Sequence, residues 1–133
     1  MPLSQQRRFP GRHASVGASR VFVTDVLSEW DLHSLIEDIT LCVSELTTNA
    51  LRHGTPPGRA FRVGLHQNGD AVRLEVRDSG PGQPVIRHTG LDTCSGRGLH
   101  IVNALADSFG VDDHVVGKTV WLTFKAPAPP HAR

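Results

Sequence analysis

The sequence predicts an α+β domain: a two-layer α/β sandwich in which helices cover one face of an antiparallel or mixed β-sheet. Apolar residues recur at steps of three and four through the first part of the chain, which is typical of amphipathic helices. In the middle of the chain the spacing changes to two, which is typical of half-buried strands. A loop, a further helical pattern and two more alternating segments follow, so the expected order is α-α-β-β-loop-α-β-β.

The first helix is expected over residues 14–30. Its apolar residues are separated by polar residues at helical intervals, and they are Val16, Val21, Phe22, Val26 and Leu27. Asp31 follows as a suitable N-cap for the next helix. The preceding segment, residues 1–13, carries a basic cluster of Arg7, Arg8 and Arg12, and it is expected to be a flexible, basic N-terminal tail.

The second helix has the clearest pattern in the chain. Its apolar positions form one narrow stripe at about 100° per residue, and they are Leu32, Leu35, Ile36, Ile39, Val43, Leu46 and Ala50. The helix should end near His53 and Gly54, because Gly54 suits a C-cap and the two prolines at 56 and 57 cannot continue a helix.

A β-hairpin is expected next. Residues 61–66 alternate between apolar and polar or small side chains, and Asn68-Gly69 is a strong signal for a two-residue turn. The return strand alternates again, with Val72, Leu74 and Val76 on one face. Asp78 has the same parity as these three residues, so the strand carries a carboxylate onto its apolar face just where it ends.

The remaining elements complete one domain over residues 14–125. Residues 83–95 show no period and contain several turn formers, which indicates a loop. Apolar spacing from Leu99 to Ala106 predicts a short helix, and residues 109–114 and 119–124 resemble a closing hairpin. The Pro-rich end, residues 126–133, is expected to be a disordered tail.

The composition of the chain argues against several classes of protein: nucleic-acid-binding, membrane and secreted proteins. The formal net charge of +1 gives no electrostatic argument for binding nucleic acid or a membrane surface. Cys42 and Cys94 form neither a disulfide framework nor a metal-binding spacing, so a reducing, cytoplasmic setting is expected. No apolar run approaches the roughly 18 residues of a membrane span, and the N-terminus lacks the apolar core of a signal peptide.

Glu45 and Asn49 form the first group that can carry chemistry. They are four residues apart on the second helix, so they are neighbours on its surface, at the flank of the apolar stripe. A carboxamide oxygen can bind Mg²⁺, and a nearby carboxylate can orient or deprotonate a nucleophile. The alternative is that both are ordinary solvated helix residues.

Asp78, Gly80 and Gly82 form the second group. A carboxylate can accept a hydrogen bond from an amino group such as the exocyclic amine of adenine, and glycines allow a flat ring to approach the backbone. The alternative is a simple strand-to-turn transition with an Asx-type turn. That alternative does not explain why Asp78 has the parity of the buried face.

Gly96, Arg97, Gly98 and Leu99 form the third group, at the start of the predicted short helix. A glycine-flanked helix N-terminus can bind phosphate, and Arg97 can add positive charge there. An ordinary helix start with an exposed arginine is the alternative. His53 closes the second helix, where a histidine is usually a favourable electrostatic contact rather than a catalytic group.

In this order, the three groups resemble the ATP-binding fold of gyrase B, sensor histidine kinases and the MutL proteins, known as the Bergerat or GHKL fold. ELTTNALRHG, residues 45–54, is similar to the N-box; DSGPG, 78–82, to the first glycine box; and GRGL, 96–99, to the second. GRGLHIVNALADSFGV, residues 96–111, resembles most closely the stand-alone anti-sigma factor serine/threonine kinases. The resemblance extends from about residue 14 to 125.

The resemblance implies a role for each matching residue. Asn49 would ligate Mg²⁺, Glu45 would act as general base, and Asp78 would hold the adenine amine of ATP. The glycines that would give the base room are Gly80 and Gly82, and the residues that would line the phosphates are Gly96, Arg97 and Gly98. Leu99, the last residue of the second box, would also belong to the nucleotide-binding site. The loop 83–95 would be a short ATP lid.

The sequence departs from the family pattern at one place. The family often has Gly-Thr entering the last strand, with the threonine near adenine, whereas this chain has Gly117-Lys118-Thr119. Lys118 therefore takes the position of the threonine. Strand parity at this stage does not decide whether Thr119 contacts adenine instead.

The resemblance implies an ATP-binding regulatory protein, and three functions compete. The first is a Mg²⁺-dependent serine/threonine protein kinase that acts on an anti-sigma antagonist, with a sigma factor as a second partner. The others are a nucleotide-dependent binding switch without phosphotransfer, and a detached histidine-kinase catalytic domain. Relatives in this group are often homodimers, so the resemblance allows a homodimer and leaves the oligomeric state open. No direct contact with nucleic acid or membrane is expected.

Overall fold

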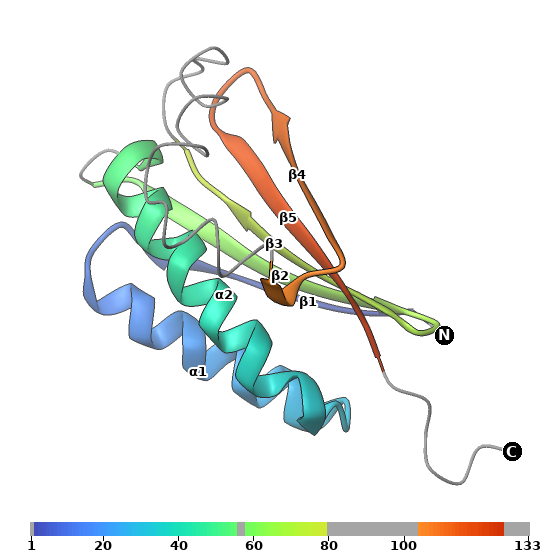
Figure 1. Ribbon diagram of the computed structural model, residues 1–133. Coiled ribbons are helices and arrows are strands. Elements are labelled where there is room, and N and C mark those ends of the chain that lie inside the picture. The colour runs from blue at the N-terminus through green and yellow to red at the C-terminus, as the bar shows by residue number, and fades with distance from the viewer. Residues whose placement is uncertain (1, 56–57, 80–103, 127–133) are drawn as a thin grey trace, which may run out of the picture.

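A computed structural model describes residues 2–55, 58–79 and 104–126 of the chain. The two main helices are α1, Ala14–Glu29, and α2, Ile36–Asn49. The strands are β1, Leu3–Pro10; β2, Ala60–Asn68; β3, Ala71–Arg77; β4, Ser108–Asp113; and β5, Lys118–Lys125. Figure 1 shows α1 and α2 side by side against one face of the sheet, which confirms the predicted two-layer α+β sandwich.

The sheet is antiparallel at every described pairing, with the strand order β1-β2-β3-β5-β4. Both predicted hairpins, β2–β3 and β4–β5, are present. Asn68 pairs with Ala71, so the first turn consists of Gly69 and Asp70, one residue later than the expected Asn68-Gly69. Gly69 has a φ of 64°, a conformation that glycine adopts without strain.

Strand β1 overturns the prediction of a flexible tail over residues 1–13. It pairs with β2 along its whole length, from Leu3 to Pro10. Phe9 fixes it in place: its side chain is buried, stacks on Phe61 with ring centroids 5.7 Å apart, and meets Phe22 edge-on at 6.0 Å. Burial of this aromatic side chain and the pairing with β2 together hold the polar and basic segment as an edge strand.

The approach to α2 also differs from the expectation. Asp31 has a φ of 62° and does not cap the helix. A short 3₁₀ helix, η1, His33–Leu35, precedes α2 instead, and no side-chain hydrogen bond caps either element. At its other end α2 continues into a wider π-helical turn, η2, Ala50–Gly54, so the helical segment ends at Gly54 as predicted.

Some expected elements lie outside the described residues. These are the loop 83–95, most of the helix expected after Gly98, and the tail 127–133. Ala104 and Leu105 are helical, in agreement with the end of that expected helix. Ala126 does not belong to a free tail, because it is buried and its N–H donates to the carbonyl of Asp70 at 2.7 Å.

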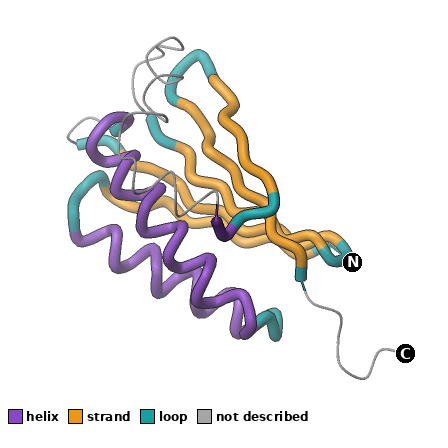
Figure 2. Tube along the Cα trace, viewed as in Figure 1, coloured by secondary structure: helices purple, strands orange, loops and turns teal. Residues whose placement is uncertain are grey.

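The core lies between the helix pair and the sheet, as Figure 2 makes clear. The apolar stripe of α2 and the alternating residues of β2, β3 and β5 are buried there as predicted, including Ile39, Val43, Leu46, Val63, Leu65, Val72, Leu74, Val76, Leu122 and Phe124. Each such side chain contributes about 1.5–3 kcal/mol. The described helices leave the other face of the sheet uncovered (Figure 2).

Within the described part of the chain, no helix combines the length and the apolar character needed to cross a membrane.

Candidate functional site

Glu45 and Asn49 lie one turn apart on α2, and both are half-buried. Their neighbours Leu46 and Ala50 are buried, so the predicted position at the flank of the apolar stripe is confirmed. Asn49 is the last residue of α2 before the π-helical turn η2, and such turns occur frequently at functional sites. Among the described residues, no cluster of three or more His, Cys, Asp or Glu side chains could hold a metal ion.

Asp78 follows the last residue of β3 and points to the helix-covered face. Only 4% of the residue is exposed, which confirms the parity prediction. The backbone N–H of Asp78 donates to the carbonyl of Lys118 at 2.9 Å, and the N–H of Lys118 donates to Oδ1 of Asp78 at 3.0 Å. The carboxylate therefore reaches across to β5 rather than only closing the turn that follows it.

Lys118 forms an ion pair with this carboxylate. Its Nζ lies 2.6 Å from Oδ2 of Asp78, and the two side chains are 12% and 3% exposed, respectively. The sequence marked Lys118 as a departure from the family pattern but gave no sign of this contact. The reason is that the contact depends on the pairing of two strands that are distant in the sequence, β3 and β5.

Gly117 permits the close approach of the β4–β5 turn to Asp78. It has a φ of 82°, and a Cβ at this position would collide with the backbone carbonyl of Asp78. Glycine is required here on both counts, because a side chain would be strained by the backbone conformation and would have no space. The local backbone thus holds Lys118 opposite Asp78.

Thr119 points to the other face of the sheet. It has the parity of Trp121 and Thr123, opposite to the buried Leu122, and its hydroxyl lies 2.8 Å from Nε2 of His114. Lys118, and not Thr119, stands beside Asp78.

The chemistry of Asp78 fits an amino group. A buried carboxylate accepts hydrogen bonds only, and each of its oxygens can accept more than one. Oδ1 already accepts from the backbone N–H of Lys118, and Oδ2 accepts from its ammonium. An incoming amine must therefore share one of these oxygens with Lys118, or displace the ammonium. Binding at this carboxylate therefore involves Lys118 directly.

Cys42 lies on α2 one turn before Glu45 and is completely buried. Burial, reinforced by the carboxylates of Asp38 and Glu45, raises the pKa of its thiol to about 12. The thiol stays protonated at neutral pH, and a protonated thiol is a poor nucleophile and metal ligand. Cys42 is therefore a core residue.

The structure brings only part of the predicted site into view. Gly80, Gly82, Gly96, Arg97, Gly98 and Leu99 lie outside the described residues. Glu45, Asn49 and Asp78 are described, and α2 packs on β3. Figure 1 shows that α2 and β3 run toward the same end of the molecule, so the last residues of the two elements lie at the same end of the two layers.

Comparison with known proteins identifies the family. A model of the histidine kinase-like ATPase domain matches residues 9–124. The chain belongs to this family. The matched region includes Glu45, Asn49, Asp78 and Lys118, and the coarse function that follows for a histidine kinase-like ATPase domain is ATP binding.

A solved structure has the same fold as this histidine kinase-like ATPase domain. It contains the RsbU and RsbW domains of Rv1364c from Mycobacterium tuberculosis, and it aligns with a TM-score of 0.73 at 24% sequence identity. The alignment covers 96% of this chain and 33% of that chain, so this chain spans a third of its length. No curated protein sequence matched the chain.

Proposed function

We propose that this ATP-binding protein is a regulatory Mg²⁺-dependent serine/threonine kinase of the anti-sigma factor type, acting on a partner protein. The observation that carries the proposal is the buried carboxylate of Asp78 at the end of β3, on the face covered by the helix that bears Glu45 and Asn49. Family membership supports ATP as the ligand. The proposal includes a cytoplasmic setting, an antagonist protein and a sigma factor as partners, and a homodimer.

Each described residue has one task in this proposal. Asp78 accepts a hydrogen bond from the adenine amine, and Asn49 offers its carboxamide oxygen to Mg²⁺. Glu45 accepts the proton of the serine or threonine hydroxyl of the partner as that oxygen attacks. Bound Mg²⁺–ATP supplies the transferable phosphoryl group, and positioning and charge neutralisation account for most of the catalysis in such reactions.

Glu45 distinguishes a kinase from a protein that only binds nucleotide. The test uses γ-³²P-ATP with Mg²⁺, a candidate antagonist protein and the Glu45→Gln variant, with Glu37→Gln in the exposed first turn of α2 as the control. We expect wild type and Glu37→Gln to label the antagonist. Glu45→Gln should bind Mg²⁺–ATP within about threefold of wild type, measured by calorimetry, and lose at least about 100-fold in labelling rate.

The outcomes separate two functions. If wild type binds ATP but never labels the antagonist, and the antagonist still binds only one nucleotide state, the protein is a binding switch and the kinase proposal fails. The ion pair between Lys118 and Asp78 favours this second candidate, because nucleotide binding then changes a buried charge pair that links β3 to β5. If Mg²⁺–ATP does not bind at all, both candidates fail.

A further inference from the structure

The uncovered face of the sheet carries a row of arginines that the proposed function does not use. Arg8 of β1 pairs directly with Arg62 of β2, and Arg62 pairs directly with Arg77 of β3. Directly paired residues of antiparallel strands point to the same face. The neighbours of these arginines in each strand, such as Phe9 and Val76, are buried, so the arginine row points away from the helices.

The arginine row is not neutralised within the described part of the chain. None of its three members forms an ion pair with a described carboxylate. On the same face, by contrast, Nε of Arg73 lies 2.6 Å from Oε2 of Glu75. Like charges directly opposite each other in a sheet are destabilising, so the row lowers the stability of the free protein.

A pair of adjoining hollows lies at this end of the sheet. Small residues on the uncovered face, Pro10, Ala60 and Ser79, line the first hollow, whose volume is about 600 Å³. Arg8, Arg12 and Arg59 also line it. The second hollow, of about 370 Å³, shares Arg8, Ala60 and Ser79 with the first, and its other lining residues are Phe61, Arg62, Arg77 and Asp78.

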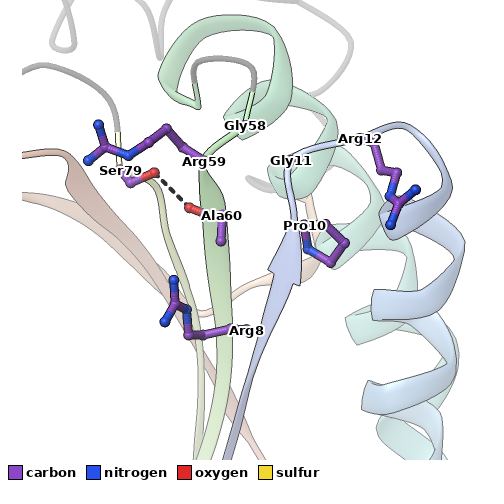
Figure 3. A pocket seen from close by; sticks show the side chains of 8 residues that line it. All are labelled: Arg8, Pro10, Gly11, Arg12, Gly58, Arg59, Ala60 and Ser79. Carbon is purple, nitrogen blue, oxygen red and sulfur yellow. Dashed lines mark hydrogen bonds between the residues drawn. The ribbon is translucent and has the colours of Figure 1, made fainter.

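Figure 3 shows how the first hollow is arranged. The guanidinium groups of Arg8 and Arg59 lie on the side of Ser79, and Arg12 lies on the opposite side, beyond Gly11. The hydroxyl of Ser79 donates to the carbonyl of Ala60 at 2.7 Å, and the N–H of Gly11 donates to the carbonyl of Arg59 at 2.8 Å. These two hydrogen bonds link the segments that carry the arginines.

We propose that the two hollows bind an acidic segment of a partner protein, with its carboxylates on the arginines. Arginine clusters recognise acidic motifs through paired N–H donors. The positive charge is concentrated at one end of one face, while the chain as a whole carries a formal charge of only +1, which does not favour a long polyanion such as nucleic acid.

The position of β1 favours a protein ligand in particular. β1, which carries Arg8, is an edge strand of the described sheet, so its outer backbone groups can pair with an extended peptide. A peptide can therefore use backbone hydrogen bonds along β1 and place its carboxylates over the arginine row. The arginine side chains point to the opposite face of the sheet from the side chain of Asp78, although Asp78 also contributes to the lining of the second hollow. Binding of the peptide there does not require nucleotide.

The test measures binding of a fluorescein-labelled octaglutamate peptide to the full chain by fluorescence anisotropy, without nucleotide. The double variant Arg62→Gln/Arg77→Gln removes two members of the row, and Arg20→Gln, exposed on the helix layer, is the matched control. We expect wild type and Arg20→Gln to bind alike and the double variant to bind at least tenfold more weakly. Its melting temperature should equal or exceed that of wild type, which excludes unfolding as the cause.

Competition decides the class of ligand. Unlabelled octaglutamate should displace the probe at lower concentration than either a 12-nucleotide single-stranded DNA or inorganic phosphate. The proposal is overturned if the double variant binds like wild type, if the DNA displaces the probe more effectively than the peptide, or if phosphate is as effective as the peptide at equal concentration.

Discussion

Arg77 and Asp78 are adjacent in the chain, but Asp78 lies beside a residue of opposite charge and Arg77 lies beside a residue of the same charge. Asp78 points toward the helices, is buried, and is matched by the ammonium of Lys118 at 2.6 Å. Arg77 points away from the helices, and its direct partner on β2 is another arginine, Arg62. A buried charge needs an oppositely charged partner within the protein, because it has lost its contact with water. Exposed charges of one sign stay hydrated and can bind an oppositely charged ligand.

The largest effect should come from breaking the buried pair. Asp78→Ala leaves the Lys118 ammonium, 12% exposed, without its partner, and it should reduce the free energy of unfolding by about 3–5 kcal/mol. Urea denaturation followed by circular dichroism measures the change. The double variant Asp78→Leu/Lys118→Met, which removes both charges, should lose much less. Equal losses of unfolding free energy in the two variants would contradict the ion pair between Asp78 and Lys118.

The turn that brings Lys118 to Asp78 can be tested through its glycine. Gly117→Ala should cost about 1–2 kcal/mol for the positive φ, plus a further loss from the collision with the Asp78 carbonyl. Gly58→Ala is the matched control, because Gly58 has a φ of 84° and open space around its missing Cβ. Gly117→Ala should therefore have a lower denaturation midpoint than Gly58→Ala. Similar midpoints for the two variants would contradict the close contact between Gly117 and Asp78.

Cys42 is also a buried ionisable group, but, unlike Asp78, its charged neighbours, Asp38 and Glu45, have the same sign as its own ionised form. Its folded pKa of about 12 exceeds the ordinary value of 9.0, so its stabilising effect is complete below pH 9 and is lost between pH 9 and 12. Near pH 10 the loss should reach about 1.4 kcal/mol. Denaturant titrations at pH 8 and pH 10 should show a steeper decline for wild type than for Cys42→Ala. Parallel declines would contradict the burial of this thiol.

The smallest effect should come from the uncovered face, and it should have the opposite sign. Arg62 lies between Arg8 and Arg77, so Arg62→Gln should raise the free energy of unfolding by about 0.2–1 kcal/mol. Thermal melts at low ionic strength measure the gain. The gain should shrink at high salt, because salt screens exposed charges. A destabilised variant would indicate that the arginine row is already neutralised in the free protein.

The same contrast explains how much could be predicted from the sequence. The alternation from Val72 to Val76 was sufficient to place Asp78 on the buried face, because the period of a strand is local. Its pairing with Lys118 could not be predicted, because it depends on the register between β3 and β5. Strand β1 was missed for a similar reason: the basic residues near Arg8 suggested a tail, and only pairing with β2 orders them.

The central claim is that Asp78 recognises the amine of an adenine nucleotide. The direct test is calorimetric binding of Mg²⁺–ATP and of purine riboside triphosphate, which lacks that amine, to wild type and to Asp78→Leu/Lys118→Met. A hydrogen bond to a charged group contributes about 1.5–3 kcal/mol, so wild type should prefer ATP by at least about tenfold. The folded double variant should bind both nucleotides within about twofold of each other. An unchanged preference for ATP in the double variant would contradict the claim.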